Sequence, residues 1–362
     1  MPRERIMIMA GGTGGHVYPA LAVAECLRQM GIELLWLGTD KGLEAELVEK
    51  HGFKLSRINI GGLRGKGLAQ LLLAPVRLCR ALYEAMIVIR EFKPDAVLGM
   101  GGYASGPGGV AAWISRIPLY IHEQNAIAGL TNRLLAPLTK LKLAGFPGSF
   151  AEKTGVEVTG NPVRQEIIDL STASKSSADL GSRPLCLLVL GGSQGALALN
   201  TTLPGVLANI PSDVDIRIWH QTGKQHLDET RKCYELAAFD GARVDAYITD
   251  MAEAYKWADL VLCRAGALTI AEVCVAGLAS ILVPFPYAVD DHQTANARVL
   301  SEGGGAVLLP EAEMKNGKLA SIITGLYRAP AKLQDMAEKT RALACPEATV
   351  RVANICAGVT NA

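Results

Sequence analysis

The stretch Ala258–Gly277 contains residues whose types and spacing could bind a nucleoside diphosphate. An apolar run, Leu260–Cys263, is followed by Arg264 and the mostly small residues 265–269, and apolar residues then recur at helical spacing. A strand that turns directly into a helix leaves unpaired backbone N–H groups at the helix start, and these groups bind anions together with the helix dipole. We therefore expect a diphosphate to lie against this helix start, where small side chains let it approach the backbone.

Glu272 lies one turn further into the same predicted helix. Its carboxylate could accept hydrogen bonds from two vicinal hydroxyls, such as those of a ribose. A purely structural role also fits, because Thr269-x-x-Glu272 matches the capping box of a helix start. The spacing alone favours the capping interpretation, whereas the other motifs of the chain favour the nucleotide.

Length and charge restrict the classes of protein to which the chain can belong. Its 362 residues exceed the usual size of a single hydrophobic core, so two domains are expected. A charged fraction of only 20% indicates a well-packed globular protein. The formal net charge of +1 provides no overall attraction to nucleic acid, so any basic patch must be local. We expect no nucleic-acid partner.

Eight cysteines are scattered along the chain without a CxxC pair, and several lie in apolar runs. This pattern indicates reduced thiols in a cytosolic protein, and neither a disulfide framework nor a zinc site. Residues 1–10 lack the features of a signal peptide, and no apolar run reaches the ~20 residues that span a bilayer. We expect a protein that is soluble or lies on a membrane surface.

Buried strands are predicted to alternate with helices in both halves of the chain. The predicted strands are 5–10, 33–37, 96–100, 118–121, 156–160, 185–190, 216–219, 246–248, 260–263 and 281–284. The predicted helices include 17–30, 43–50, 196–207, 319–327, 331–343 and 348–357. Such alternation is typical of a doubly wound parallel sheet, in which the loops after the strands gather at one edge. The fold class is therefore α/β, with two similar domains.

Two glycine-rich loops follow buried strands, Gly11–Gly15 ahead of His16 and Gly191–Gly195 in the second half. Their similarity is a weak internal repeat that supports two related domains. Neither loop is a G-x-G-x-x-G fingerprint, because Thr13 and Ser193 stand at the third position, and the chain has no Walker motif. A dehydrogenase or a nucleoside triphosphatase is therefore disfavoured.

Segment 61–80 combines leucines with cations. It contains Arg64, Lys66, Leu68, Leu71, Leu72, Leu73, Pro75, Val76, Arg77 and Arg80, and we expect Trp113, Lys140 and Lys142 to lie near it. Leucines beside basic residues are typical of a patch that docks on a membrane surface. The leucines could instead face the domain core, because Leu82, Met86 and Ile89 continue as an apolar helical stripe. Both interpretations remain open at this point.

Seven motifs, in order along nearly the whole chain, resemble the MurG family of UDP-N-acetylglucosamine transferases. They are Gly11-Gly-Thr-Gly-Gly-His16, Gly101-Gly-Tyr-Ala-Ser-Gly-Pro107, His122-Glu-Gln-Asn125, Gly160-Asn-Pro-Val-Arg164, Gly191-Gly-Ser-Gln-Gly195, Arg264–Glu272 and Asp291-His-Gln-Thr-Ala-Asn296. The resemblance implies a GT-B fold, that is, two Rossmann-like doubly wound parallel-sheet domains with an interdomain cleft. We expect an acceptor and membrane-facing domain of residues 1–163 joined by helix 345–362, and a UDP-GlcNAc-binding domain of residues 164–344.

The resemblance also implies an activity. GlcNAc would pass from UDP-GlcNAc to the muramic acid 4-hydroxyl of undecaprenyl-pyrophosphoryl-MurNAc-pentapeptide (lipid I), with inversion, to give lipid II in peptidoglycan synthesis. The enzyme would be peripheral, at the cytoplasmic face of the bacterial inner membrane, with cell-wall synthesis and division proteins as further partners and roles in cell shape and the cell cycle. It would need no cofactor, and the absence of a suitable D-x-D-like pair argues against a metal bridge.

Residue roles in donor binding follow from the same resemblance. Ala267, Leu268 and Thr269 would contact the diphosphate, Glu272 the ribose hydroxyls, and the backbone of Ile248 the uracil edge. His292 and Gln293 would contact the sugar hydroxyls, although some family members carry Gln at the position of His292. The remaining expected donor-site residues are Thr13, Gly14, Asn125, Arg164 and Ser193.

An inverting displacement needs one base to remove the acceptor proton. The candidates are His16, His122 and Glu123, with Tyr103 as a neighbour that positions the acceptor. His16 is predicted at a helix start, where the dipole disfavours the imidazolium and so favours a neutral base. A histidine after four glycines could instead only fix its loop by hydrogen bonding. Two alternative functions are a GT-B transferase with another lipid acceptor, such as a diacylglycerol, and a non-catalytic UDP-sugar-binding protein.

Overall fold

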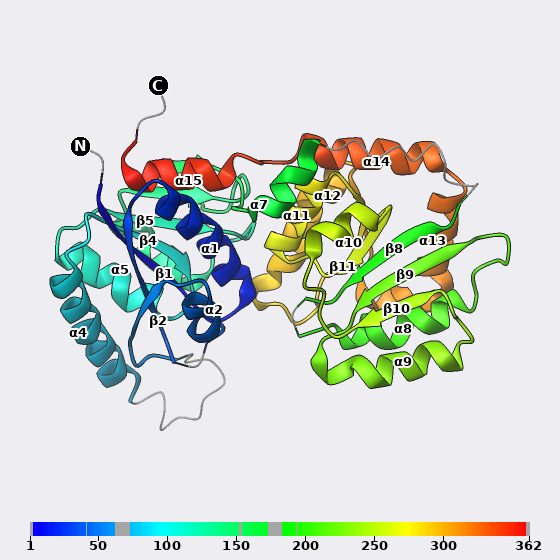
Figure 1. Ribbon diagram of the computed structural model, residues 1–362, viewed down its shortest axis with the longest axis horizontal. Coiled ribbons are helices and arrows are strands. Elements are labelled where there is room, and N and C mark those ends of the chain that lie inside the picture. The colour runs from blue at the N-terminus through cyan, green and yellow to red at the C-terminus, as the bar shows by residue number, and fades with distance from the viewer. Residues whose placement is uncertain are drawn as a thin grey trace. The chain divides into compact units, whose positions relative to one another are not determined.

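The computed structural model describes residues 3–40, 42–61, 73–151, 154–172, 183–192 and 194–359. The chain forms two units: Met1–Arg164 together with Glu347–Ala362, and Gln165–Pro346. Each unit is built around one parallel sheet (Figure 1). Ser193 and the leucines and cations at positions 64–72 lie outside the described residues.

The first unit contains a sheet of seven strands among its described residues, in the order β3-β2-β1-β4-β5-β6-β7. The strands are β1 (Arg5–Ala10), β2 (Glu33–Gly38), β3 (Lys54–Arg57), β4 (Ala96–Gly101), β5 (Leu119–Glu123), β6 (Leu141–Ala144) and β7 (Val156–Val158). Every neighbouring pair is parallel. The order reverses between β1 and β4, which is where doubly wound sheets bind ligands.

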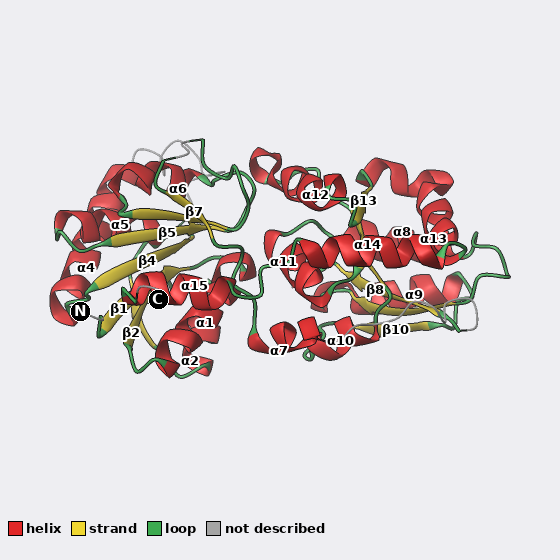
Figure 2. Ribbon diagram, turned by 90° about the horizontal axis from the view of Figure 1, so that it is seen from above, coloured by secondary structure: helices red, strands yellow, loops and turns green. Residues whose placement is uncertain are grey.

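Helices cover both faces of this sheet, and this explains why its central strands are continuous apolar runs. The helices are α1 (Gly14–Gln29), α2 (Glu44–Lys50), α4 (Ala74–Phe92), α5 (Ser105–Ile114), α6 (Leu130–Leu135), the short helix η1 (Ala136–Leu138) and α15 (Ala348–Ala357). Residues of α1 and α15 form one core cluster with the strands. Residues of α4, α5 and α6 form the other. Figure 2 shows α15 lying beside α1, although α15 is the last helix of the chain.

The second unit repeats the plan, with the strand order β10-β9-β8-β11-β12-β13 among its described residues. The strands are β8 (Leu185–Leu190), β9 (Ile216–Gln221), β10 (Ala242–Asp245), β11 (Leu260–Cys263), β12 (Ala279–Leu282) and β13 (Ala306–Leu308). The helices are α7 (Gln165–Ile168), α8 (Leu197–Leu207), α9 (Leu227–Leu236), α10 (Met251–Trp257), α11 (Ala267–Ala276), α12 (His292–Glu302), α13 (Leu319–Tyr327) and α14 (Pro330–Ala342). Single turns are η2 (Asp169–Thr172), η3 (Lys224–His226), η4 (Val289–Asp291), η5 (Glu311–Glu313) and η6 (Met314–Lys318).

The prediction of an α/β chain with two doubly wound parallel sheets is confirmed. The predicted strands 5–10, 185–190 and 260–263 and the helices 319–327 and 348–357 have the observed bounds. The predicted strand 246–248 is wrong, because the strand in this region is Ala242–Asp245. This strand lies at the edge of the sheet and is partly exposed, so it contains polar residues. The more apolar residues that follow it, which suggested a strand, form a turn.

Candidate active site

Two glycine loops of the first unit lie against each other at the carboxyl ends of β1 and β4. Gly102 has φ +89°, and a Cβ atom there would lie 2.3 Å from the Gly11 carbonyl oxygen. Gly101 has φ +103°, and its Cβ would lie 2.8 Å from the imidazole ring of His16. Only glycine permits both the backbone conformation and this approach. The structure thus brings the predicted base candidate His16 against the second glycine loop.

Glu44 holds the first glycine loop in place. The Gly12 N–H donates to Glu44 Oε2 at 2.9 Å, and the Thr39 N–H and hydroxyl donate to Oε1 at 3.1 and 2.8 Å. The carboxylate is fully buried, so these three donors replace the water that it loses. The sequence analysis missed Glu44, because it begins helix α2 and nothing in its local pattern indicates burial.

His16 lies in the first turn of α1 and is half-buried. Its Nδ1 lies 2.9 Å from Oε1 of Gln124, and its backbone N–H donates to the Thr13 carbonyl oxygen at 3.1 Å. Thr13 precedes the helix and is exposed, and Gly14 is the first helical residue. The loop–helix junction therefore presents both the predicted donor-site pair and the predicted base.

His122 lies within strand β5 and is fully buried. Its Nε2 lies 3.0 Å from the Gly160 carbonyl oxygen, and its Nδ1 lies 3.1 Å from Nε2 of Gln124. Burial lowers the pKa of His122 to about 4, against the raising effects of the Gly160 carbonyl and the nearby Glu123. With both nitrogens engaged, His122 is suited to fix Gln124 and unsuited to take a proton from a substrate.

Glu123, the last residue of β5, is also buried, with 2% of its surface exposed. Its Oε1 accepts from the Asn125 N–H at 3.0 Å and from the Asn125 side chain at 3.1 Å. Its Oε2 accepts from the Gly129 N–H at 3.0 Å and from Asn132 Nδ2 at 2.9 Å. Four donors therefore occupy the carboxylate, which organises the loop that carries Asn125 and is not placed as a base.

Tyr103 and Arg164 belong to the same unit as His16. Tyr103 lies between β4 and α5 and is 53% exposed, so its ring and hydroxyl are accessible. The guanidinium of Arg164 lies 5.6 Å from the ring centroid of Tyr18 on α1, which fits a cation–π contact. Both side chains thus remain candidates for contact with a substrate.

In the second unit, β11 leads through residues 264–266 into α11. The N-cap is Gly266, so Ala267, Leu268 and Thr269 occupy the first helical turn. The capping-box interpretation is therefore wrong, because Thr269 lies inside the helix and not at its cap. The first backbone N–H groups of a helix have no intrahelical partner, and this first turn is where the sequence predicts a diphosphate.

Glu272 lies on the second turn of α11 and is 6% exposed. Its Oε2 accepts a hydrogen bond from the hydroxyl of Tyr255 on α10 at 3.0 Å. A buried phenol thus fixes the carboxylate that the sequence predicts for the ribose. Tyr255 was missed, since its partner follows 17 residues later on another helix.

Arg264 fixes the turn between β11 and α11 from the other side. Its Nη1 donates to the carbonyl oxygens of Val283 and Pro284 at 3.2 Å each, and its Nη2 pairs with Glu311. Within the matched motif, Arg264 therefore supports the loop after β12.

Helix α12 supports the same region. Asn296 Nδ2 donates to the Ala265 carbonyl oxygen at 3.2 Å, and Gln293 Oε1 accepts from the Phe285 N–H at 2.9 Å. His292 is the first residue of α12 and is half-buried. The predicted sugar-binding pair thus lies at a helix start that is tied to the start of α11.

The Ile248 N–H, which the sequence predicts to read a uracil edge, donates to Gln221 Oε1 at 2.9 Å. Gln221 Nε2 in turn donates to the Gly192 carbonyl oxygen at 3.0 Å. Gln221 therefore joins the loop after β8 to the turn after β10. The sequence analysis missed Gln221, because it predicted β9 to end at Trp219.

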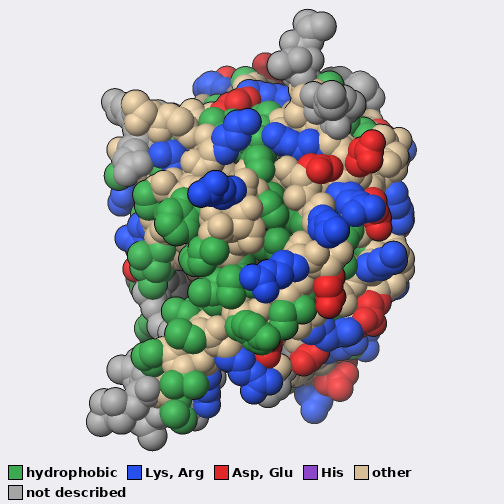
Figure 3. All heavy atoms as spheres, turned by 90° about the vertical axis from the view of Figure 1, so that its left-hand side faces the viewer, with side chains coloured by type: hydrophobic (Ala, Val, Ile, Leu, Met, Phe, Trp, Pro, Cys, Tyr) green, Lys and Arg blue, Asp and Glu red, His purple; other side chains and the backbone are tan. Residues whose placement is uncertain are grey.

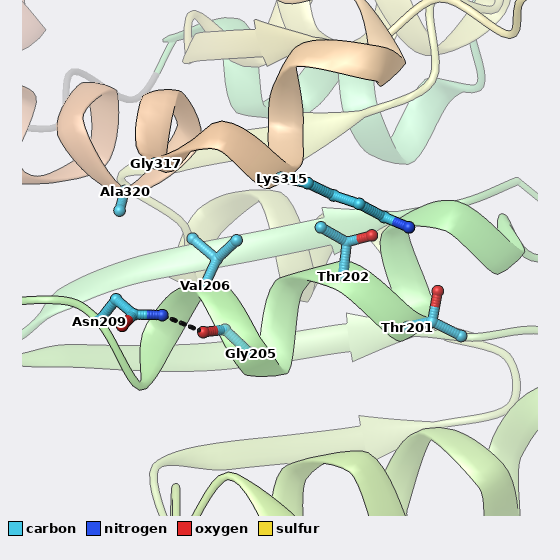
Figure 4. Close-up of a pocket in the computed structure, with 8 residues that line it drawn as sticks. All are labelled: Thr201, Thr202, Gly205, Val206, Asn209, Lys315, Gly317 and Ala320. Atoms are coloured by element: carbon cyan, nitrogen blue, oxygen red, sulfur yellow. Dashed lines mark hydrogen bonds between the residues drawn. The ribbon is translucent and has the colours of Figure 1, made fainter.

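A separate hollow of about 640 Å³ lies between α8 and the turn at η6 (Figure 4). Figure 4 shows Thr202 and Val206 on α8 pointing toward the turn that carries Lys315 and Gly317. The lining residues are Thr201, Thr202, Gly205, Val206, Asn209, Lys315, Gly317 and Ala320. None of them is predicted for the site, so this hollow has no part in the function proposed below.

Comparison with known proteins identifies the family. The glycosyltransferase family 28 N-terminal domain matches residues 6–141, and the C-terminal domain of the same family matches residues 186–352. Two similar relatives carry the name UDP-N-acetylglucosamine–N-acetylmuramyl-(pentapeptide) pyrophosphoryl-undecaprenol N-acetylglucosamine transferase. The one from Alkalilimnicola ehrlichii is 52% identical over 356 residues, and the one from Nitrosococcus oceani is 51% identical over 354 residues. Each alignment covers 97% of this chain and 98% of the relative.

A solved structure agrees with these sequence relatives. The crystal structure of Acinetobacter baumannii MurG is 39% identical to this chain, with a TM-score of 0.80, and the match covers 98% of this chain and 99% of that one. The relatives and this solved structure match almost the whole chain. The chain therefore belongs to the MurG family of glycosyltransferase family 28.

Proposed function

We propose that this protein transfers GlcNAc from UDP-GlcNAc to the muramic acid 4-hydroxyl of lipid I, forming lipid II with inversion in peptidoglycan synthesis. The proposal rests on one observation. Over nearly its full length, the chain is about 50% identical to relatives whose names state this donor and this acceptor. The hydrogen bonds described above for Glu272 and His16 further support the proposal. An acceptor other than lipid I, or binding without catalysis, is not favoured.

Most of the donor contacts are assigned to the second unit, whereas Thr13, Gly14, Asn125 and Arg164 belong to the first. The first turn of α11, with Ala267, Leu268 and Thr269, would hold the diphosphate through backbone N–H groups. Glu272, fixed by Tyr255, would accept hydrogen bonds from the ribose hydroxyls. The further proposed donor contacts are Thr13, Gly14, Asn125, Arg164, Ser193, Ile248, His292 and Gln293. For Ile248, the backbone N–H must leave Gln221 before it can bind a base.

The reaction is a single displacement. The acceptor hydroxyl oxygen attacks the anomeric carbon, the bond from that carbon to the diphosphate oxygen breaks, and its electron pair leaves with UDP. The start of α11 would stabilise the charge that develops on UDP, because its N–H groups are already oriented. We assign the base to His16, which is half-buried, while His122 and Glu123 are buried and fully engaged.

We propose that the N-terminal end of α4 attaches the protein to the cytoplasmic face of the membrane. No helix among the described residues is long and apolar enough to cross a bilayer. Leu73, Val76 and Leu78 are at least half exposed, and the neighbouring Arg77 and Arg80 are exposed as well. For these described residues the alternative that the apolar side chains face the core is wrong; burial begins at Ala81.

We name Leu73, Val76, Arg77, Leu78 and Arg80 the α4 patch. The exposed α5 residues Trp113 and Ile114 lie in the same unit. Figure 3 shows hydrophobic side chains gathered among Lys and Arg on this side of the unit. Lys142, in contrast, is 7% exposed and does not belong to the surface, since it lies within β6. Apolar contact combined with cations is the pattern that gives reversible binding to anionic lipid.

Incubation with radiolabelled UDP-GlcNAc and lipid I tests the proposed function. We expect label in a lipid-linked disaccharide, and no comparable transfer to diacylglycerol. Transfer to diacylglycerol alone would replace the acceptor, and tight UDP-GlcNAc binding without transfer to either lipid would indicate a binding protein.

A further inference from the structure

Three side chains of the first unit form a hydrogen-bonded chain that ends at a backbone carbonyl. His16 Nδ1 lies 2.9 Å from Gln124 Oε1, Gln124 Nε2 lies 3.1 Å from His122 Nδ1, and His122 Nε2 lies 3.0 Å from the Gly160 oxygen. Gln124 is 2% exposed and His122 is fully buried. The chain therefore runs from a half-buried histidine into the protein interior.

The direction of each hydrogen bond follows from the atoms involved. A carbonyl oxygen only accepts, so His122 Nε2 carries a proton and donates it to the Gly160 oxygen. The amide nitrogen of Gln124 only donates, so His122 Nδ1 is unprotonated and accepts. A neutral His122 satisfies both conditions, in agreement with its pKa of about 4.

The orientation of the Gln124 amide is fixed a second time. Its Nε2 also donates to the His122 carbonyl oxygen at 3.2 Å, and turning the amide over would place Oε1 against that oxygen. The backbone of both residues is held as well. Asn161 Nδ2 donates to the backbone carbonyl oxygen of Gln124 at 2.9 Å, and Asn132 Nδ2 donates to that of His122 at 3.1 Å. Gln124 Oε1 therefore faces His16 as an acceptor.

We propose that Gln124, oriented by His122, is a positioning residue that holds His16 in the tautomer with Nδ1 protonated and Nε2 unprotonated. Nε2 is then the nitrogen with a lone pair for the acceptor hydroxyl. When Nε2 takes that proton, Nδ1–H keeps its bond to Gln124, and this bond strengthens because its donor is now charged. The proposal deepens the proposed function by assigning how the base is prepared, and it rests on His16 being that base.

The two histidines are thereby given opposite tautomers, and this can be measured without turnover. In the whole protein labelled with ¹⁵N-histidine, His16→Asn and His122→Asn variants would assign the ring signals. For the neutral form of each ring, we expect the proton of His16 on Nδ1 and that of His122 on Nε2. A neutral His16 protonated at Nε2, or a neutral His122 protonated at Nδ1, overturns the proposal.

Gln124→Met keeps the side-chain length and removes all three hydrogen bonds of the side-chain amide. We expect His16 in this variant to become a mixture of tautomers, and kcat to fall roughly 10- to 100-fold with the UDP-GlcNAc KM changed by less than about twofold. A merely structural role would leave the His16 tautomer unchanged, and that outcome overturns the proposal. If wild-type protein transfers no GlcNAc, the proposed function fails, whereas the ¹⁵N spectra still decide the tautomers.

The second unit offers a matched control. Asn200 Oδ1 lies 3.0 Å from Nε2 of the buried His220, whose Nδ1 lies 2.9 Å from the Tyr234 hydroxyl. This is another buried histidine with an amide partner, and it belongs to the unit that does not contain His16. Asn200→Leu is expected to change the His220 ring signals and to leave those of His16 in place. If Asn200→Leu changed the His16 ring signals as much as Gln124→Met does, the effect of Gln124→Met would not be specific, and the positioning role of Gln124 would lose its support.

Discussion

The hydroxyl of Tyr255 donates to Glu272 Oε2 at 3.0 Å, so a residue of α10 determines where the carboxylate on α11 lies. The ribose assignment predicts that Glu272→Gln mainly raises the UDP-GlcNAc KM. The variant removes charge-assisted hydrogen bonds worth ~1.5–3 kcal/mol, which corresponds to roughly a 10- to 150-fold increase in KM. Steady-state kinetics with varied donor measures it. Tyr255→Phe keeps the charge of Glu272 but removes the hydrogen bond that positions its carboxylate, and should raise the UDP-GlcNAc KM less. An unchanged donor KM with a lower melting temperature would contradict the ribose assignment.

Glu44 is expected to stabilise the loop that precedes His16. Glu44→Ala leaves the Gly12 N–H and the Thr39 donors without their acceptor, and we expect a loss of ~2–4 kcal/mol in the free energy of unfolding. Glu46 lies in the same first turn of α2 but is exposed, so Glu46→Ala is the matched control with a change within ~0.5 kcal/mol. Urea denaturation of both variants provides the comparison. Equal losses would mean that Glu44 does not hold the loop.

Two buried histidines predict sensitivity to acid. Burial lowers the pKa of His122 to about 4 and that of His220 to about 3, whereas both titrate near 6.5 once unfolded. Between pH 6.5 and about 4 the unfolded chain therefore binds more protons, so stability is lost as pH falls, by up to ~1.4 kcal/mol per pH unit for each histidine. Above pH 6.5 they contribute no slope. Urea denaturation at a series of pH values measures this dependence.

A variant separates these histidines from the carboxylates. His220→Gln removes one titrating group and should lower the slope between pH 6 and 5 by up to ~1.4 kcal/mol per pH unit, since each histidine contributes one proton. A slope that stays the same in His220→Gln, or a wild-type stability that does not fall over this range, would contradict the buried neutral state.

The α4 patch predicts binding to anionic vesicles. Each exposed apolar side chain and cation adds to this binding, with about 1 kcal/mol for each cation near the surface. We expect Val76→Ser combined with Leu78→Ser and Arg77→Gln to weaken sedimentation with anionic vesicles and to reduce activity on long-chain lipid I. Activity on a short water-soluble acceptor should remain. Leu236→Ser is the control, because Leu236 is 88% exposed on α9 of the other unit. Unchanged vesicle binding in the triple variant would place the docking surface elsewhere.

The central strands were predictable from sequence because helices bury them on both faces, so β8, β11 and the part of β1 after Arg5 are uninterrupted apolar runs. Edge strands such as β3 and β10 were missed or misplaced, because one side is exposed and polar residues alternate there. The hydropathy pattern therefore identifies strands that neighbouring elements bury on both faces. It does not identify edge strands, which lack a neighbouring strand on one side.

The site was predictable as a set of residue types but not as a set of roles. The motif His122-Glu-Gln-Asn125 was recognised, yet the predicted strand ended at Ile121, so the burial of His122 and Glu123 was not foreseen. Gln124 stands inside that motif, and this was the one available signal for it. Its role depends on contact with His16, 108 residues away, which no local pattern contains.

Helix α15 packs on α1, and the Thr349 hydroxyl joins the backbone of Val163 by bonds of 2.9 and 3.1 Å. The first unit is thus interrupted in the chain by the whole of residues 165–346. A ribosome must finish the second unit before the last helix of the first one exists. During synthesis, the apolar face of α1 that α15 covers stays open while 182 further residues are made, counted from Gln165 to Pro346. Nascent chains should therefore need protection on that face longer than their position at the N-terminus suggests.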